Sequence, residues 1–375
     1  MQTVSYCLVH RGGGSFGGPL KIALDATPLV LSSGGLQRYV AELSCALARE
    51  FPDDKYQLMS DQPFQTPPDC PPNLIQSRNE TSRRWWLWGL RRALRDNGVQ
   101  LFHGTNFEVP WLPPVPSVMT IHDLSPWRNP EWHPGPNRVR NRTPWLIRLH
   151  RASRILTVSE AVRREVIARF GVADELVRSV PLAASDRFRP LNVMEPRATP
   201  YFLYVGTLEP RKNIEALVDT WTATQAQTGA ELILVGRTRS DFVPIPPRPG
   251  LIQVGEVPDE ELPGLYSNAL AFVYPTHYEG FGLPVLEAMQ SGCPVITSRD
   301  PAVMEVSGGA ALHAHGTAEL AQAMIAVSET PELCQQLRTG GLRRAEDFSW
   351  RRTATETRAL YSEALALSSA PGAAH

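Results

Sequence analysis

Tyr201-Phe-Leu-Tyr-Val-Gly206-Thr-Leu-Glu-Pro-Arg211-Lys212-Asn213 joins an apolar run to a glycine loop and then to a segment that can begin a helix. A short apolar run that stops at glycine is typical of a buried strand, and the change after the loop predicts a helix. The first half of the chain opens in the same order, with Lys21-Ile-Ala-Leu-Asp25 and then the Gly34-Gly35 turn. Each half therefore begins as a strand–loop–helix unit.

Short apolar runs alternate with longer helical segments along both halves. Strands are predicted at residues 56–59, 99–103, 117–122, 155–158 and 177–182, and then at 201–206, 231–235, 251–254, 271–274 and 294–297. Ser159 predicts the N-cap of a helix that runs through Phe170, and residues 317–367 are predicted to be almost wholly helical. Strands that alternate with helices form right-handed units and a mostly parallel sheet covered on both faces. The predicted fold class is α/β, with two Rossmann-like domains.

The chain divides into predicted segments of different character. They are a flexible leader over 1–20, a first α/β domain over 21–185, a second over 186–348 and a final helix over 349–368. The aperiodic, proline-containing residues 186–200 favour a linker. In the leader, Gly12-x-Gly14-x-x-Gly17 matches the dinucleotide fingerprint, but Gly18-Pro19 stands where its helix should begin. That context excludes the fingerprint as the cofactor site.

The composition is that of an ordinary globular protein. Of 375 residues, 42% are hydrophobic and 20% are charged, a length and balance that suit two domains. The formal net charge of −1 lacks the basic excess typical of nucleic-acid-binding proteins. No apolar run approaches the ~20 residues that span a bilayer, and the N-terminus does not resemble a signal peptide. The scattered cysteines are expected to be reduced thiols, and the predicted location is the cytoplasm.

Two glutamates bracket a glycine loop after the predicted strand at 271–274. The segment Glu279-Gly280-Phe281-Gly282-Leu283-Pro-Val-Leu-Glu287 passes into a helix, whose free N–H groups suit a diphosphate. Carboxylates beside phosphates favour neutral donors such as sugar hydroxyls, so we assign Glu279 to a transferred sugar and Glu287 to a nucleotide ribose. Taken alone, Glu279 is explained equally well as a solvated loop residue, and Glu287 as a charge favoured near the start of a helix.

Arg211 and Lys212 place two cations between a predicted strand and a helix. Such a pair can neutralise the charge that develops on a diphosphate leaving group and so replace a divalent metal. The sequence contains no Asp-x-Asp motif to hold a metal, and no metal is predicted. The alternative for the pair alone is a solvated basic loop.

Two features of the first half also lie after predicted strands. The Gly34-Gly35 turn allows close approach of a donor phosphate or an acceptor, or is a tight turn without a ligand. His122 ends the predicted strand at 117–122, where it could hydrogen-bond a sugar hydroxyl or orient the acceptor. Its position alone favours a structural role for this histidine.

Residues 82–95 combine arginine and tryptophan as Ser82-Arg-Arg-Trp-Trp-Leu-Trp-Gly-Leu-Arg-Arg-Ala-Leu-Arg95. An amphipathic helix on an anionic membrane surface has this composition. Trp86, Leu90 and Leu94 also form a stripe that would pack on the core, with the arginines in solvent. We favour the core interpretation and leave peripheral membrane contact open.

Together these motifs resemble the retaining glycosyltransferases of family 4, which have the two-domain GT-B architecture. The resemblance extends from Lys21 to about Leu365 and rests on five motifs in order: Gly34-Gly35, Ile121-His-Asp123, Val205-Gly-Thr-Leu-Glu-Pro-Arg-Lys-Asn213, Glu279-Gly-Phe-Gly-Leu-Pro-Val-Leu-Glu287 and Gly292-Cys-Pro-Val-Ile-Thr297. It implies two domains that face each other across a cleft, with the acceptor on the N-terminal side. It also implies that the final helix returns to the N-terminal domain.

The resemblance implies retaining, metal-independent transfer of a hexose from a nucleoside diphosphate sugar, without a cofactor. Similarity to mannosyltransferase-like members makes GDP-mannose the first expected donor and a UDP-sugar the second. The expected acceptor is a glycan or lipid-linked glycan in polysaccharide biosynthesis. The family's catalytic positions match His122, Arg211, Lys212 and Glu279. Its donor-binding positions match Gly34, Gly35, Gly206, Arg211, Lys212, Glu279, Gly280, Phe281, Gly282, Leu283 and Glu287.

Two other functions suit the same architecture, because fold does not dictate function. One is a sugar-nucleotide 2-epimerase, and the other is a non-catalytic relative that binds a nucleotide as a regulatory module. The sequence leaves the linkage and the oligomeric state open.

Overall fold

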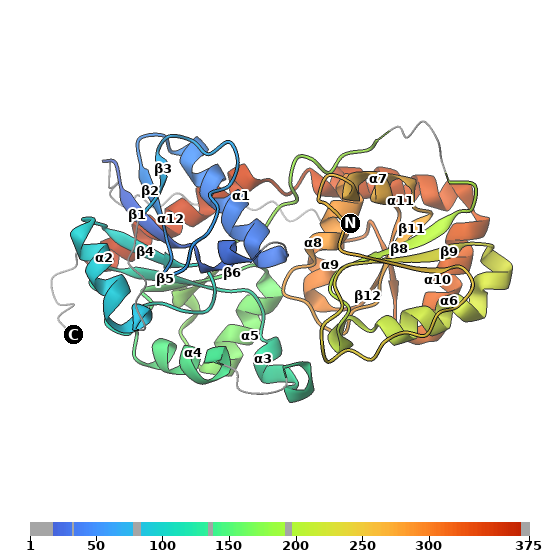
Figure 1. Cartoon of the computed structure of the whole chain (residues 1–375), viewed down its shortest axis with the longest axis horizontal. Coiled ribbons are helices and arrows are strands. Elements are labelled where there is room, and N and C mark those ends of the chain that lie inside the picture. Colours follow the sequence, from blue (N-terminus) through green and yellow to red (C-terminus); the bar gives the residue numbers. More distant parts are fainter. Residues whose placement is uncertain (1–17, 32–33, 78–83, 134–137, 192–196, 369–375) are drawn as a thin grey trace, which may run out of the picture.

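The computed structural model describes residues 18–31, 34–77, 84–133, 138–191 and 197–368. The chain forms two lobes, each built around one parallel sheet (Figure 1). The glycine run of the leader, Ser33 and Arg83 lie outside the described residues. Leu20, at the end of the predicted leader, is buried, and its N–H donates to Asp54 Oδ1 at 2.7 Å.

The first lobe contains a parallel sheet in which the order of the strands reverses near the centre. In spatial order its described strands are β3 (Leu74–Gln76), β2 (Lys55–Met59), β1 (Lys21–Asp25), β4 (Leu101–Gly104), β5 (Ser117–Ile121), β6 (Arg154–Thr157) and β7 (Val177–Ser179). β1 therefore pairs with both β2 and β4. Ligands of open α/β sheets bind beyond the carboxyl ends of the strands at such a reversal.

The second lobe repeats this arrangement. Its described strands, in spatial order, are β10 (Leu251–Gly255), β9 (Glu231–Val235), β8 (Tyr201–Val205), β11 (Ala271–Tyr274), β12 (Val295–Ser298) and β13 (Leu312–Ala314). β8 pairs with both β9 and β11, so the reversal lies between β8 and β11. The loops after these two strands are where a ligand of this lobe is expected.

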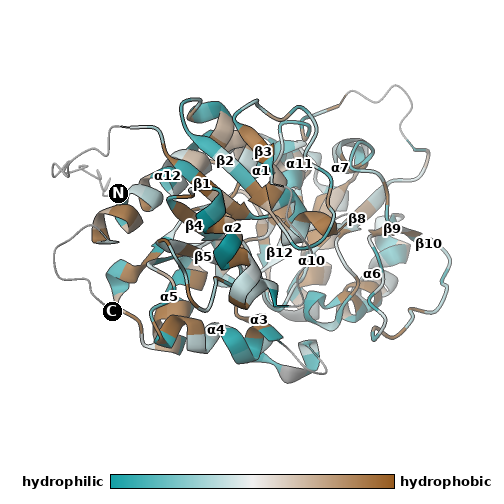
Figure 2. Cartoon of the chain, turned by 60° about the vertical axis from the view of Figure 1, so that its left-hand side comes forward, coloured by the Kyte–Doolittle hydropathy of each residue, from teal (hydrophilic) through white to brown (hydrophobic). Residues whose placement is uncertain are grey.

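Helices cover both sheets, and those such as α5 and α6 carry hydrophilic and hydrophobic stretches together (Figure 2). In the first lobe the α-helices are α1 (Gly35–Glu50), α2 (Leu90–Asp96), α3 (Ser125–Arg128), α4 (Arg138–Arg148) and α5 (Glu160–Phe170). In the second they are α6 (Ile214–Thr228), α7 (Leu262–Asn268), α8 (Leu283–Gln290), α9 (Pro301–Ser307), α10 (Gly316–Glu329) and α11 (Pro331–Ala345). Short 3₁₀ turns lie at Thr27–Val30, Pro130–Trp132, Asp174–Leu176 and Pro210–Lys212. The predicted two-domain α/β fold is confirmed.

Local signals in the sequence act as predicted at α5. The Ser159 side chain accepts a hydrogen bond from the Val162 N–H at 3.2 Å, and the left-handed Gly171 ends the helix. The predicted strand at 177–182 is shorter in the structure, because β7 stops at Ser179.

The last helix, α12 (Trp350–Ser368), returns to the first lobe as predicted and lies beside α1 (Figure 1). The Tyr361 hydroxyl lies 2.7 Å from Nδ1 of the fully buried His103, and Thr353 Oγ1 donates to the carbonyl of Pro181 at 2.7 Å. Arg358 Nε donates to Asp54 Oδ2 at 2.5 Å. Both buried polar contacts and an ion pair therefore fix α12 to the first lobe.

The arginine- and tryptophan-containing segment packs mainly on the core. Leu90 and Leu94 are buried as the core interpretation predicts, but the buried indole is that of Trp85, with Trp86 only half-buried. The reason is a π-helical turn at Trp85–Gly89, in which the Leu90 N–H donates to the carbonyl of Trp85. This turn contains one more residue than an α-turn and shifts the stripe by one position. Within the described part of the chain, no helix has the length and apolar character to cross a membrane.

Candidate active site

The loops after β8 and β11 meet at the reversal of the second sheet. The backbone N–H of His277 donates to the carbonyl of Arg211 at 2.9 Å, and Asn213 Nδ2 donates to the carbonyl of Pro275 at 3.1 Å. Arg211 Nη1 donates to the carbonyl of Tyr278 at 3.0 Å. The Arg-Lys motif and the first glutamate, which are far apart in the sequence, are thereby brought together.

Glu279 lies at the centre of a buried cluster with both predicted cations. Lys212 Nζ forms an ion pair with Glu279 Oε1 and donates to the Tyr274 hydroxyl at 2.6 Å. The same Glu279 oxygen accepts from Tyr274 at 2.9 Å and from Thr276 Oγ1 at 3.1 Å, while Arg211 Nη1 lies 3.3 Å from Oε2. Both carboxylate oxygens are therefore engaged, which the assignment of Glu279 to sugar hydroxyls did not anticipate.

Electrostatics keep this cluster charged despite its burial. Burial alone would raise the pKa of Glu279, but Lys212 and Arg211 outweigh it and hold that pKa at about 2. Burial and the neighbouring Arg211 lower the pKa of Lys212, against the attraction of Glu279. The carboxylate therefore stays ionised at neutral pH, and its charge fixes the direction of both cations.

A second carboxylate extends the cluster toward the first lobe. Glu209 Oε1 lies 2.6 Å from Arg211 Nε, and Glu209 Oε2 lies 3.0 Å from Arg239 Nη1. Arg239 Nη1 also donates to the carbonyl of Trp132 in the first lobe at 2.7 Å. Arg239 also pairs with Asp241 at 2.5 Å, so three cations meet three carboxylates and the formal charges balance. Arg211 and Lys212 are thereby held in the loop after β8, where a ligand of this sheet is expected.

The glycine loop before α8 lies against the first lobe. A Cβ atom on Gly280 would stand 1.9 Å from the carbonyl oxygen of His122, so only glycine permits this approach. Ser159 Oγ donates to the carbonyl of Gly280 at 2.6 Å, and Gly282 has a φ of 98° at the N-cap of α8. Phe281 is buried with its ring 5.9 Å from that of Phe348, and Leu283 begins α8.

His122 directly follows β5 and has a defined tautomer. Its Nε2 lies 2.8 Å from the carbonyl of Thr105, and because a carbonyl only accepts, Nε2 carries the proton. Burial lowers its pKa, so the ring is neutral and Nδ1 is an acceptor. The edges of Tyr39 and Phe107 pack at centroid distances of 4.8 Å and 6.0 Å.

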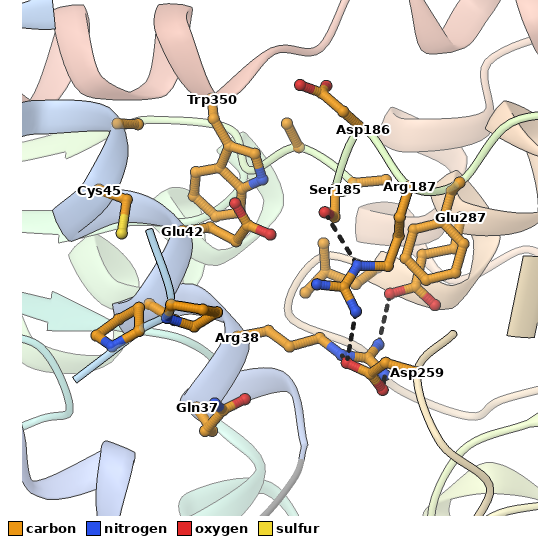
Figure 3. A pocket seen from close by; sticks show the side chains of 18 of the residues that line it. Gln37, Arg38, Glu42, Cys45, Ser185, Asp186, Arg187, Asp259, Glu287 and Trp350 are labelled. Atoms are coloured by element: carbon orange, nitrogen blue, oxygen red, sulfur yellow. Dashed lines mark hydrogen bonds and ion pairs between the residues drawn. The ribbon is translucent and has the colours of Figure 1, made fainter. Parts of the chain in front are cut away.

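Glu287 is 2% exposed and is held from across the cleft. Arg38 Nη1, from α1 of the first lobe, lies 2.7 Å from Glu287 Oε1 (Figure 3). The Tyr266 hydroxyl donates to Glu287 Oε2 at 3.2 Å. Arg38 also pairs with Asp259. Burial raises the pKa of Glu287, with Arg38 opposing it. Glu287, Arg38, Asp259 and Leu283 line a cavity of about 320 Å³ between the lobes.

The remaining predicted glycines occupy turns and helix starts. Gly34 has a φ of 114° and precedes α1, which Gly35 begins and which carries Arg38 to Glu287. Gly206 follows β8 with a φ of 150°, and its N–H donates to the carbonyl of Val235 at 2.9 Å. The described contacts place neither Gly34 nor Gly35 against the Arg211–Lys212–Glu279 cluster.

Sequence reasoning missed the partners of the two glutamates. Tyr274 and Tyr266 lie in apolar stretches of the sequence and are buried in the structure. Their hydroxyl groups need hydrogen-bond partners once buried, and this need is the one sign of a polar role. Glu209 stands within the quoted Gly206–Asn213 motif and was a readable signal. Arg38 and Asp259 are distant in sequence and meet only through the packing of the lobes. Within the described residues, no group of three or more His, Cys, Asp or Glu side chains is placed to hold a metal ion.

Comparison with known proteins agrees with this geometry. Residues 199–330 match the family model "Glycosyl transferases group 1", and residues 33–184 match "Glycosyltransferase Family 4". The O-antigen chain mannosyltransferase B of Escherichia coli is 37% identical over 76% of this chain and 79% of its own length. The serotype-specific mannosyltransferase WbdA of Escherichia coli is 28% identical over 66% of this chain, which spans about a third (33%) of that longer protein.

Among solved structures, sucrose-phosphate synthase from Thermosynechococcus elongatus superposes with a TM-score of 0.74. Its sequence is 20% identical, and the alignment covers 93% of this chain and 100% of that one. This similarity concerns the fold, whereas the mannosyltransferase relative and the two family models carry the family. The chain belongs to the family 4, group 1 glycosyltransferases, and it is a glycosyltransferase with the GT-B fold.

Proposed function

We propose that this enzyme transfers a mannosyl unit from GDP-mannose to a glycan or lipid-linked glycan, with retention of anomeric configuration and without a metal or other cofactor. The observation that carries this proposal is the buried Arg211–Lys212–Glu279 cluster at the reversal of the second sheet. A UDP-sugar is the second candidate donor.

The diphosphate of the donor suits Arg211, Lys212 and the start of α8. Arg211 offers paired N–H donors and Lys212 a compact charge, and the free N–H groups of α8 add further donors. In this arrangement the ribose reaches Glu287, which requires Arg38 Nη1 to leave that carboxylate. Asp259 holds Arg38 through Nε at 3.1 Å and stays as its partner when Glu287 is released.

Transfer proceeds on one face of the sugar. The bond between the anomeric carbon and the phosphate oxygen breaks, and the acceptor oxygen forms its bond on the same face. The acceptor's proton passes to the departing phosphate, so no protein nucleophile is required. Arg211 and Lys212 stabilise the charge on the leaving group. The Nδ1 of His122 accepts a hydrogen bond from a sugar hydroxyl at the lobe interface.

Mannose as the transferred sugar is supported by the relatives. Two of them, one covered over 79% of its length, are named mannosyltransferases, and the first acts on an O-antigen chain by its name. The acceptor class follows from the same names. The family models themselves name neither the transferred sugar nor its acceptor.

The test begins with thermal unfolding of the purified chain in the presence of GDP-mannose, UDP-glucose and UDP-N-acetylglucosamine. A ligand that binds the folded state raises the melting temperature, so GDP-mannose should raise it most. Slow release of mannose from the same donor, followed by transfer to mannose oligosaccharides at full rate in excess EDTA, is the expected activity.

Three results would contradict the proposal. They are the absence of binding by every nucleoside diphosphate sugar, a strict requirement for Mg²⁺, or a product with inverted anomeric configuration in proton NMR. Interconversion of a UDP-sugar without any acceptor would instead identify an epimerase.

A further inference from the structure

A second cavity, of about 360 Å³, opens in the first lobe beside the carboxyl ends of β1 and β2. Thr27 follows β1 and Gln62 follows β2, and both line it. Its volume lies within the range of roughly 300–1,000 Å³ typical of small-ligand sites. It is separate from the cavity at Glu287, and it lies at the edge where an open α/β sheet binds ligands.

The lining combines flat aromatic side chains with guanidinium groups. The Arg142 guanidinium lies 5.8 Å from the ring centre of Trp86 and 5.4 Å from that of Trp111. Glu108, which is 7% exposed, lies 3.2 Å from Arg142 Nη1 and 3.0 Å from Arg138 Nε. Two rings and a carboxylate therefore hold Arg142 in one orientation at the cavity.

Several polar groups around this cavity lack a partner. Among the described residues, Arg142 Nε and Nη2 and Trp85 Nε1 are buried and make no hydrogen bond. Buried donors in native proteins are nearly always satisfied, so each such group needs an explanation. Three unpaired N–H-bearing atoms on two side chains that line one cavity are explained by a ligand rich in acceptor oxygens.

The π-helical turn explains how the chain places its tryptophans here. Because Trp85–Gly89 contains the extra residue, consecutive Trp85 and Trp86 both line the cavity, while Trp88 on the same turn is 53% exposed. Single π-helical turns occur frequently at functional sites.

The cavity is joined to the cleft between the lobes by directly packed residues. Glu108, the partner of Arg142, follows Phe107, whose ring lies 6.0 Å from the ring of His122. Thr143 Oγ1, adjacent to Arg142 on α4, donates to the carbonyl of Phe107 at 3.0 Å. The His122 carbonyl in turn faces Gly280 of the donor loop. The cavity is therefore connected to the His122–Gly280 contact through contiguous protein contacts.

We propose that this cavity binds a pyranose unit of the acceptor glycan, an inference that rests on the proposed glycosyl transfer. A pyranose presents an apolar C–H face, which packs on the indoles of Trp86 and Trp111. Its hydroxyl oxygens accept from Arg142 and Trp85, and its hydroxyl groups donate to Asp61 and Gln62, which also line the cavity.

The test compares Trp111→Ala and Arg142→Lys with Trp88→Ala as the matched control. The probe is mannotriose, with GDP-mannose as donor, and KM is measured separately for each substrate. Trp111→Ala and Arg142→Lys should each raise the acceptor KM at least tenfold and leave the donor KM within twofold. Trp88→Ala, which alters an indole on the same turn outside the cavity, should leave both constants within twofold.

Binding of mannotriose alone, measured by calorimetry, separates this inference from the proposed function. Wild-type binding that Trp111→Ala abolishes supports the cavity even if no donor is turned over. Transfer with an unchanged acceptor KM in a folded Trp111→Ala variant overturns the cavity and leaves the proposed function standing. An equal loss in Trp88→Ala would also overturn it. If Trp111→Ala does not fold, the acceptor KM of Arg142→Lys is the test, and an unchanged value overturns the cavity.

Discussion

Lys212 is 6% exposed, and its charge lies between the Glu279 carboxylate and the Tyr274 hydroxyl. We predict that Lys212→Ala lowers kcat at least about 100-fold and changes the donor KM much less, because charge stabilisation in a transition state is worth ~3 kcal/mol. Steady-state kinetics with GDP-mannose check this, with the exposed Lys55→Ala as control. Equal kcat for Lys212→Ala and the parent would remove Lys212 from the mechanism.

Asp25, at the end of β1, is 2% exposed and accepts from the backbone N–H and Oγ1 of Thr27 at 3.0 Å and 2.6 Å. Burial raises its pKa from 3.8 to about 7. A raised folded-state pKa means that the stability present below pH 3.8 is lost as pH rises through 7, where the buried group ionises.

Asp25→Asn should therefore be more stable than the parent at pH 8, by as much as several kcal/mol, since one unit corresponds to about 1.4 kcal/mol. Near pH 5 the difference should be smaller, because only about a third of the pH interval between the unfolded-state pKa of 3.8 and the folded-state pKa of about 7 has then been crossed. Urea unfolding of both proteins at the two pH values measures the gap. The same difference in free energy of unfolding at both pH values would contradict the raised pKa of Asp25.

At the scale of the element, the Tyr361–His103 contact is one of the buried polar contacts that hold α12 on the first lobe. Tyr361→Phe leaves a buried His103 nitrogen without its partner, which typically costs about 1–3 kcal/mol. Denaturant unfolding should show this loss. The matched control on the same helix is Arg351→Ala, whose side chain is 80% exposed and should change little. Indistinguishable unfolding of Tyr361→Phe and the parent would show that this hydrogen bond does not help to hold α12.

Elements with strong periodic signals could be predicted from sequence, and weak ones could not. The buried runs of β1, β8, β9 and β11 were placed, because each is an apolar stretch bounded by turn residues. β3 and β13 were missed, since each has only three residues at a sheet edge and too short a pattern. The π-helical turn was also missed, because no pattern in a single sequence distinguishes its shift from an α-helix.

The candidate site follows the same rule. The Arg211, Lys212 and Glu279 cluster was anticipated as separate motifs, because each follows a predicted strand whose carboxyl end defines the ligand edge. The pairing of Arg38 with Glu287 could not be anticipated, since it depends on how the two lobes are placed.

At the scale of the whole molecule, Arg38 of the first lobe is joined to the Glu287 carboxylate of the second. It contacts Glu287 and Asp259 from α1, and charged hydrogen bonds of this kind are worth about 1.5–3 kcal/mol. We predict that Arg38→Ala shifts the donor-free protein toward a more open form with a larger radius of gyration in small-angle scattering. Arg49→Ala, an exposed arginine on the same helix, is the control. Superimposable curves for Arg38→Ala and the parent would show that Arg38 does not hold the lobes together.

The most direct test of this account is the position of GDP in a crystal structure of the complex. The account predicts phosphate oxygens within about 3 Å of Arg211 and Lys212, the ribose hydroxyls on Glu287, and Arg38 displaced from that carboxylate onto Asp259. A nucleotide bound elsewhere, with Arg38 still paired to Glu287 and the Arg211–Lys212–Glu279 cluster free of phosphate, would contradict it.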